Sequence, residues 1–193
     1  MTWRTCILPV ILAVCSTVLL EQPAVAQPAG GNSVDAAAIH QFDAAIAKYL
    51  ASRKRLLGEV AGPVPESTAP KLTQASDALA AAIQRSRPKA RPGDLFMPPV
   101  TAVIKRRVVD VVQKENLGPV LAGIDDEEAG PKAPSIHMRF PAAAPMATMP
   151  PSLLAVLPKL PKELEYRIIG NYLILRDVDA ALILDVIPGA VPR

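Results

Sequence analysis

Apolar and polar residues alternate most cleanly near the end of the chain, in two short runs at 164–169 and 172–177. The runs are joined by Gly170-Asn171, and a two-residue connection of this type between β-rich runs predicts a hairpin. Pairing across the turn predicts three opposed pairs: Ile169 with Tyr172, Arg167 with Ile174, and Glu165 with Arg176. One face then carries only apolar side chains: Leu164, Tyr166, Ile168, Leu173 and Leu175. A slip by one residue would destroy this sorting, so the register is well specified.

Residues 181–187 continue the C-terminal pattern with isoleucine, leucine and valine. They predict a third strand of a β-meander, with Leu182, Leu184 and Val186 on one side. A short helix capped by Asp179 is the alternative. A three-stranded sheet with one apolar face is only marginally stable by itself, so we expect helices from the rest of the chain to cover it.

Helix-period spacing predicts three helices in the N-terminal half. The first, over 35–57 with Ser33 as N-cap, has one seam: Ile39, Phe42, Ile46, Tyr49, Arg53 and Leu56. The second starts near 67 or 68, ends before Pro88, and has the seam Leu72, Ala75, Leu79 and Ile83. The third spans about 98–115, and its β-branched residues keep a strand open as the alternative: Val100, Val103, Ile104, Val108, Val111 and Val112.

Proline, with 21 residues, gathers in the connecting segments. Residues 118–150 contain an acidic run at 125–128 and little periodicity, which predicts an exposed linker. The prolines of 141–161 predict extended chain whose leucines pack on the sheet. The predicted class is therefore α+β: Ala-rich N-terminal helices, a Pro-rich linker, a small C-terminal antiparallel β-meander, and some disordered parts.

The N-terminus has the pattern of a secretory signal peptide. Arg4 precedes an apolar run over 6–20, and Ala24-Val25-Ala26 forms an A-x-A cleavage site. This run is shorter than the about 20 residues that span a bilayer. The alternatives are lipidation of Cys15 or an uncleaved anchor. Cleavage after Ala26 predicts a periplasmic or secreted protein without a stable transmembrane span.

These boundaries divide the chain into a signal peptide (1–26), a flexible leader (27–34), a helical region (35–117), a linker (118–150) and a C-terminal β-meander module (151–193). Both cysteines, Cys6 and Cys15, lie in the predicted signal peptide. The mature chain would then contain no disulfide, thiolate nucleophile or thiolate metal site. A net charge of +3 is mild and says little about partners.

The segment from Leu160 to Ala180 reads Leu-Pro-Lys-Glu-Leu-Glu-Tyr-Arg-Ile-Ile-Gly-Asn-Tyr-Leu-Ile-Leu-Arg-Asp-Val-Asp-Ala. It resembles a recurring ending of uncharacterised exported proteins of Gram-negative bacteria, and the resemblance covers about residues 141–188. It implies a periplasmic or secreted protein. It implies no activity, so no functional residue is carried over.

Few residues suggest catalysis or metal binding. His40 and His137 belong to no H-E-x-x-H, H-x-H or G-x-S-x-G pattern, and the acidic run lacks the spacing of a calcium loop. We therefore expect no metal and no cofactor. Asp177, Asp179 and Asp185 suggest an acid pair for hydrolysis, although turn and solvent-facing strand positions explain them more simply.

Basic residues are concentrated between positions 53 and 107, where eleven lysines and arginines face four acidic residues. The candidate residues for contact with an anionic surface, such as phospholipid or polysaccharide, are Arg53, Lys54, Arg55, Lys105, Arg106 and Arg107. Nucleic acid fits poorly, because Phe96 is the only aromatic residue near the later clusters. We expect a non-enzymatic, exported interaction module that contacts another envelope protein or the anionic envelope surface through its helices; the alternative is a periplasmic hydrolase that uses Asp177 or Asp179.

Overall fold

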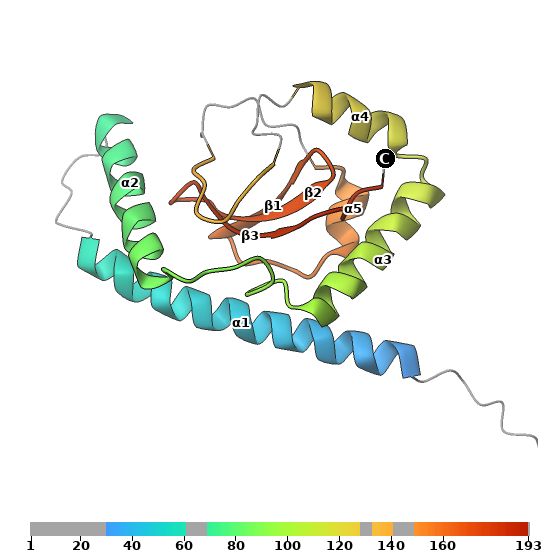
Figure 1. Cartoon of the computed structure of the whole chain (residues 1–193), viewed down its shortest axis with the longest axis horizontal. Helices are drawn as coiled ribbons and strands as arrows, with labels where there is room; N and C mark the ends of the chain where they lie inside the picture. Colours follow the sequence, from blue (N-terminus) through green and yellow to red (C-terminus); the bar gives the residue numbers. More distant parts are fainter. Residues whose placement is uncertain (1–29, 61–68, 128–132, 141–148, 193) are drawn as a thin grey trace, which may run out of the picture.

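The C-terminal hairpin is the centre of the fold. The computed structural model describes residues 30–60, 69–127, 133–140 and 149–192 (Figure 1). The hairpin and the segment after it form one antiparallel sheet in the order β1-β2-β3: β1 (Leu164–Ile169), β2 (Tyr172–Asp177) and β3 (Leu182–Ile187). Gly170, in the turn, has a φ of 57°, which glycine adopts without steric cost. The register of β1 against β2 is the predicted one, with Glu165 opposite Arg176.

β3 contains an extra residue that the alternating pattern does not reveal. Arg176 pairs with Ile183 and Leu175 pairs with Asp185, which leaves Leu184 as the additional residue of a β-bulge. Because side chains alternate between the faces of a strand, the residues beyond the bulge exchange faces.

The bulge corrects two predictions. The pattern places Val186 beside Leu182 and Leu184, but Val186 packs in a separate cluster on the opposite face of the sheet. The pattern also places Asp185 toward solvent. In the structure Asp185 is fully buried and lies opposite Leu175, whose side chain belongs to the main core.

Apolar side chains cover both faces of the sheet. The predicted apolar face forms the main core together with the helices, through Leu164, Tyr166, Ile168, Leu173, Leu175, Leu182 and Leu184. On the other face, Phe140 joins a smaller cluster with Ile169, Ile174, Ile183 and Val186. The predicted α+β class is confirmed, and the helices cover the sheet as expected.

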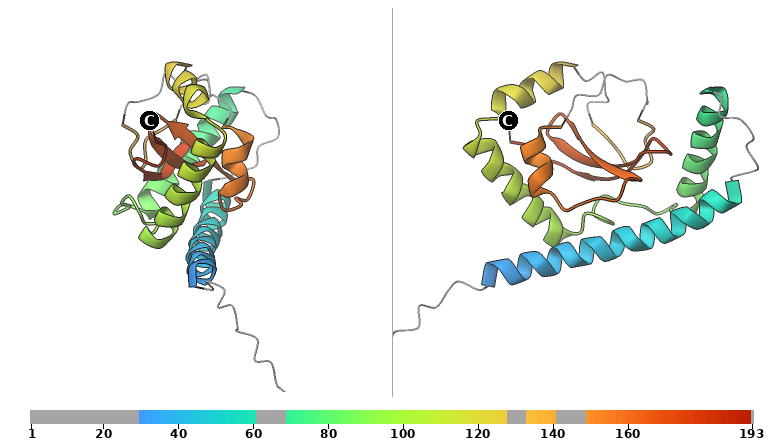
Figure 2. Two further views of the ribbon diagram at one scale, coloured as in Figure 1. Left: turned by 90° about the vertical axis from the view of Figure 1, so that its right-hand side faces the viewer. Right: turned by 180° about the vertical axis from the view of Figure 1, so that it is seen from behind.

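Five helices surround the sheet in the described ranges (Figures 1 and 2). The long helix α1 (Gly30–Val60) spans one side of the molecule, and α2 (Ala69–Ser86) and α3 (Pro98–Lys114) cross it near its two ends. The shorter helices are α4 (Gly118–Glu127) and α5 (Pro151–Val156), and α5 lies between α3 and the sheet. None of these helices is both long and apolar enough to cross a bilayer.

The seams of α1 and α3 follow the predicted spacing, since steps of three and four place side chains on one side of a helix. α1 buries Ala38, Phe42, Ile46, Tyr49, Arg53 and Leu56, and α3 buries Val100, Val103, Ile104, Val108 and Val112. In α1, Ala38 takes the place predicted for Ile39. Because α1 begins at Gly30, Ser33 lies inside the helix rather than at its N-cap, and the predicted leader at 27–34 is helical from residue 30 onward.

The predicted seam of α2 is only half correct. Leu72 is 59% exposed and Ala75 is also exposed, because the first turns of α2 project beyond the core. The helix packs instead through its second half: Leu79, Ala80, Ala82 and Ile83.

The prediction of an exposed linker over 118–150 is wrong in two places. Its first ten residues form α4. Later, the backbone N–H of His137 donates to Ile183 at 2.9 Å, and that of Phe140 donates to Ala181 at 2.9 Å. The segment that ends at Phe140 therefore covers the outer edge of β3, and the burial of this phenylalanine explains why it is ordered.

The extended chain predicted over 141–161 is also partly wrong. α5 begins after Pro150, with proline in its first turn, where the missing N–H would have had no helical partner. The expected packing of its leucines is confirmed, since Leu153 and Leu157 are buried. Residues 141–148 lie outside the described residues, as does the predicted signal peptide.

Candidate interaction site

Asp177, the last residue of β2, is the centre of a buried polar cluster and is 0% exposed. Its Oδ2 accepts hydrogen bonds from the Tyr49 hydroxyl and from Arg53 Nε, both at 2.6 Å. Its Oδ1 accepts one from the backbone N–H of Ala180 at 2.9 Å. Arg53 also pairs with Asp179 at 2.5 Å. The cluster therefore fixes the middle of α1 to the end of the hairpin.

The protonation states of this cluster support the same role. Burial raises the pKa of Tyr49, and the adjacent negative charge of Asp177 raises it further. Burial disfavours the charged form of Arg53, but its hydrogen bonds to Asp177 and Asp179 and their charges raise its pKa overall. At neutral pH, Tyr49 thus remains a hydrogen-bond donor and Arg53 remains the cation that compensates the buried carboxylate.

Asp185, in β3, makes a second buried attachment. Its Oδ2 accepts from the backbone N–H groups of Leu95 at 2.7 Å and Phe96 at 2.8 Å. Its Oδ1 accepts from those of Gly93 and Val186, each at 2.8 Å. The first three donors lie in the turn between α2 and α3, where Gly93 has a φ of 91°. This carboxylate therefore holds the interhelical turn against the sheet.

The three aspartates proposed for hydrolysis differ in their exposure and in their partners. Asp177 and Asp185 are enclosed and fully engaged by donors. The Asp179 side chain is 65% exposed and is paired with Arg53. A general acid or base must reach a proton of the substrate, and neither buried carboxylate has an approach of that kind.

A cavity of about 430 Å³ lies beside the Asp177 cluster, between α1 and the turn that follows α2. The Arg87 guanidinium lies over the Tyr49 ring, 5.9 Å from its centroid, and pairs with Asp94 at 3.7 Å. Arg53 contributes to the lining but is compensated by its aspartates. Both arginines of this cavity therefore already have acidic partners.

The basic residues predicted to contact an anionic surface fall into two groups of three. On α1, Arg53 is 5% exposed and engaged with Asp177, so its predicted surface role is wrong. Lys54 and Arg55 are exposed, and Arg55 lies 3.9 Å from Glu59. This group therefore presents less free charge than the sequence suggests.

The second group lies on α3. Arg106 pairs with Asp35 at 2.5 Å, and the hydrogen bond and charge of that carboxylate raise the pKa of Arg106. Arg107 donates to the carbonyl of Val156 at 3.2 Å, and Lys105 is half-buried. Because Asp35 belongs to the first turns of α1, this group lies near the opposite end of α1 from the first one. The six residues do not form one patch.

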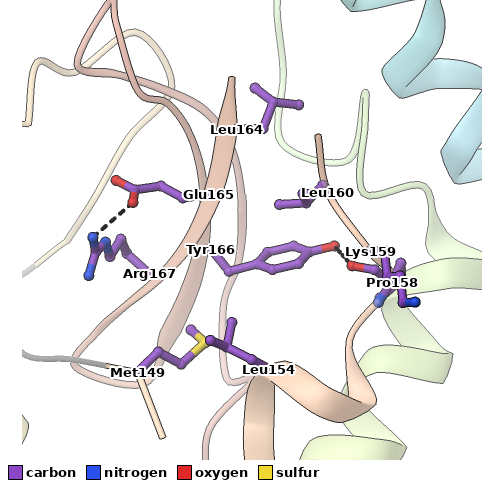
Figure 3. A pocket seen from close by; sticks show the side chains of 9 residues that line it. All are labelled: Met149, Leu154, Pro158, Lys159, Leu160, Leu164, Glu165, Tyr166 and Arg167. Atoms are coloured by element: carbon purple, nitrogen blue, oxygen red, sulfur yellow. Dashed lines mark hydrogen bonds and ion pairs between the residues drawn. The ribbon is translucent and has the colours of Figure 1, made fainter. Parts of the chain in front are cut away.

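A groove of about 330 Å³ lies beside β1, the first strand of the sheet (Figure 3). It is lined by four consecutive strand residues and by the segment before the strand: Met149, Leu154, Pro158, Lys159, Leu160, Leu164, Glu165, Tyr166 and Arg167. In Figure 3 the Tyr166 side chain points across the groove toward Pro158, whereas Glu165 and Arg167 point to the other side of the strand. The Tyr166 hydroxyl donates to the Pro158 carbonyl at 3.0 Å, which holds this wall in place.

The outer edge of β1 presents backbone groups to this groove. In an antiparallel pair, alternate residues direct their N–H and C=O groups toward the neighbouring strand. The Glu163 carbonyl accepts from the Val178 N–H at 2.9 Å, so odd-numbered residues face β2 and even-numbered residues face outward. The Leu164 N–H donates to a nearby loop carbonyl at 3.0 Å. This register directs the N–H groups of Tyr166 and Ile168 outward, and neither donates to a backbone carbonyl of the described residues outside the strand pairing.

The histidines and acidic residues form no metal centre in the described ranges, where no three potential ligands converge. His40 is exposed on α1. His137 has a φ of 67°, and Gln84 Nε2 donates to its carbonyl at 3.0 Å. Burial and the positive charge of Arg87 lower the pKa of the His137 ring. The acidic run at 125–128 begins within α4, and its side chains lie outside the described residues.

Comparisons with protein-family models, with curated proteins and with solved structures found no match for this chain. The role of each site therefore rests on its own geometry and chemistry.

The buried ion pair between α1 and the hairpin could not be located from the sequence, although one signal was present. Arg53 occupies the same helical seam as Tyr49 and Leu56, and a charged residue among apolar ones indicates a buried partner. That partner was not identifiable, because Asp177 is the last residue of its strand and has the pattern of a turn residue. The pair joins positions 124 residues apart, a distance that local patterns do not bridge.

Proposed function

We propose that this chain is an exported, non-enzymatic module of the cell envelope that binds another polypeptide along the outer edge of β1. The observation that carries the proposal is the outward-facing N–H groups of Tyr166 and Ile168, which lie at a strand edge beside an apolar groove. An extended chain that adds to such an edge gains main-chain hydrogen bonds, and an adjacent pocket selects its side chains.

Two further observations support binding over hydrolysis. Asp177 and Asp185, the carboxylates that favoured an enzyme in the sequence, are engaged in holding the helices on the sheet. The basic residues that favoured an anionic surface are divided between the two ends of α1 and partly neutralised. Export is supported by the signal-peptide pattern that ends at Ala26.

The test places a photo-crosslinking amino acid at Lys159, which is exposed and lines the groove, in the protein within its native envelope. A matched control carries the same amino acid at Lys54, which is exposed on α1. We expect polypeptide adducts at position 159 and not at position 54.

A second substitution makes the result specific to the groove. Leu154 is 47% exposed and lines the groove, so Leu154→Arg changes the binding surface without burying a charge. Adducts at position 159 should disappear in this variant. The absence of polypeptide adducts, or adducts that persist unchanged with Leu154→Arg, would contradict the proposal.

A further inference from the structure

The outer edge of β1 is complementary to itself, and we propose that its occupant is a second copy of this chain, paired antiparallel about Tyr166. The inference rests on the proposed function and names the partner. In this arrangement Tyr166 lies opposite Tyr166 of the partner subunit. The two three-stranded sheets become continuous across the pair.

In this pairing, outward-facing backbone groups of one strand meet outward-facing backbone groups of the other. The outward-facing residues are even-numbered, and a centre at Tyr166 matches even positions with even positions. The two Tyr166 residues exchange N–H···O=C bonds with each other. The Ile168 N–H meets the carbonyl of Leu164 of the partner subunit, and the symmetric bond forms on the other side. The Leu164 N–H already has an intrachain acceptor, so it makes no bond to the carbonyl of Ile168 of the partner subunit, and the pairing uses the N–H groups of Tyr166 and Ile168.

The charges select the same register. The side chains of Glu165 and Arg167 are 23% and 19% exposed and lie 2.8 Å apart on one side of the strand. Pairing about Tyr166 sets each Glu165 opposite Arg167 of the partner subunit. Two neighbouring registers also pair even-numbered residues with even-numbered residues. One sets Arg167 opposite Arg167 of the partner subunit, and the other sets Glu165 opposite Glu165 of the partner subunit. Opposite charges stabilise cross-strand pairs and like charges destabilise them, so the register about Tyr166 is preferred.

The other edge of the sheet is not available for the same contact, because residues up to Phe140 pair with β3 there. A single strand edge is a small interface compared with the about 1,200–2,000 Å² of stable complexes. We therefore expect a weak, reversible dimer whose population depends on protein concentration.

Charged residues on strand edges also occur as a protection against association, and this alternative makes the opposite prediction. If Glu165 and Arg167 protected the edge, removal of one charge would strengthen association. If they are complementary across a dimer, removal of one charge weakens it.

The experiment is sedimentation equilibrium of the mature protein over a wide concentration range at low salt, with substitutions at Arg167. Arg167→Lys should retain the wild-type dissociation constant within about threefold. Arg167→Glu sets carboxylates opposite each other at two symmetric places and should raise the dissociation constant at least about tenfold. Arg167→Ala should lie between them. Lys54→Glu, on α1, is the control for a change in charge elsewhere. Glu165 is left intact because its carboxylate also accepts from the buried Arg176.

Three results would overturn self-pairing: a wild-type protein that is monomeric at every concentration, association that is insensitive to Arg167→Glu, or association that becomes tighter in Arg167→Ala. The first of these results concerns the wild-type protein alone, so it tests self-pairing even if no variant folds. A monomeric protein that still forms groove-dependent adducts with a different polypeptide at position 159 overturns only the self-pairing. If the protein neither associates with itself nor forms groove-dependent adducts at position 159, the proposed function is overturned as well.

Discussion

Asp177 and Asp185 illustrate how a buried carboxylate is tolerated at the scale of a single residue. Each is unexposed to solvent and accepts four hydrogen bonds of 2.6–3.3 Å from the described residues. Asp177 is matched by a full positive charge on Arg53, whereas the described donors to Asp185 are all backbone N–H groups. Buried ionised groups are stable only with partners of this kind, and the removal of one partner leaves the other uncompensated.

Asp177→Asn should therefore lower the free energy of unfolding by about 3–5 kcal/mol, because it leaves Arg53 buried without its main counter-charge. Denaturant unfolding followed by circular dichroism measures the change. Asp179→Asn is the matched control: this side chain is 65% exposed, so the loss should stay below about 1 kcal/mol. Equal losses of unfolding free energy in the two variants would contradict the view that the buried Asp177–Arg53 pair stabilises the fold more than the exposed Asp179–Arg53 pair.

His137 should make stability depend on pH. Its ring has a pKa below the ordinary value of 6.5 in the folded protein, so the unfolded chain takes up the proton first as the pH falls. The folded state therefore loses stability below about pH 6.5. His137→Asn removes the titration and suits the backbone φ of 67°, because asparagine tolerates the left-handed region.

The measurement is the difference in unfolding free energy between wild type and His137→Asn from pH 7 to pH 5. As the pH falls, the unfolding free energy of the variant should rise relative to that of the wild type. A constant difference over this range would contradict the assigned direction of the pKa shift.

At the scale of elements, the parts set by local sequence were predictable and the parts set by distant contacts were not. The Gly170-Asn171 turn and the alternation around it specify the register of β1 and β2, and helix-period spacing locates α1 and α3. The bulge at Leu184 leaves no local mark, because its neighbours are all apolar apart from Asp185, which the alternation assigns to solvent. The same holds for the segment ending at Phe140, which is ordered by a cluster on the far side of the sheet.

The candidate site was predictable to a similar extent. The first strand of a meander has an open edge unless another segment covers it, so the edge of β1 follows from the predicted order of strands. The groove beside this edge could not be predicted from the sequence, because the residues of α5 and its flanks have the pattern of extended chain. The charges of Glu165 and Arg167 were visible, but their complementarity becomes apparent only once the outward-facing residues of the edge are known.

The turn between α2 and α3 offers a prediction at this scale. Gly93 has a φ of 91° and donates to Asp185, so Gly93→Ala should destabilise the protein by about 1–3 kcal/mol through backbone strain. Gly58 lies inside α1 with open space around it, so Gly58→Ala should stabilise by up to about 1 kcal/mol. Thermal unfolding of both variants tests the pair, and a loss of stability in both would contradict the account.

At the scale of the whole molecule, the helices and the sheet share one hydrophobic core and are joined by two buried carboxylates. One attachment lies at the end of β2 and the other lies in β3. β3 is protected by the segment ending at Phe140, and β1 faces the groove. This arrangement leaves the edge of β1 as the surface on which, in our proposal, a partner strand adds to the sheet.

The most direct test of an open β1 edge that pairs with a second copy is backbone amide hydrogen exchange. It is measured residue by residue along β1 as the protein concentration rises. In dilute protein the amides of Tyr166 and Ile168 should exchange much faster than those of Arg167 and Ile169, which face β2 and serve as internal controls. At high concentration the two outward amides should become protected while the controls stay unchanged. Slow exchange of Tyr166 and Ile168 in the dilute monomer would show that the edge is already occupied and would contradict the account.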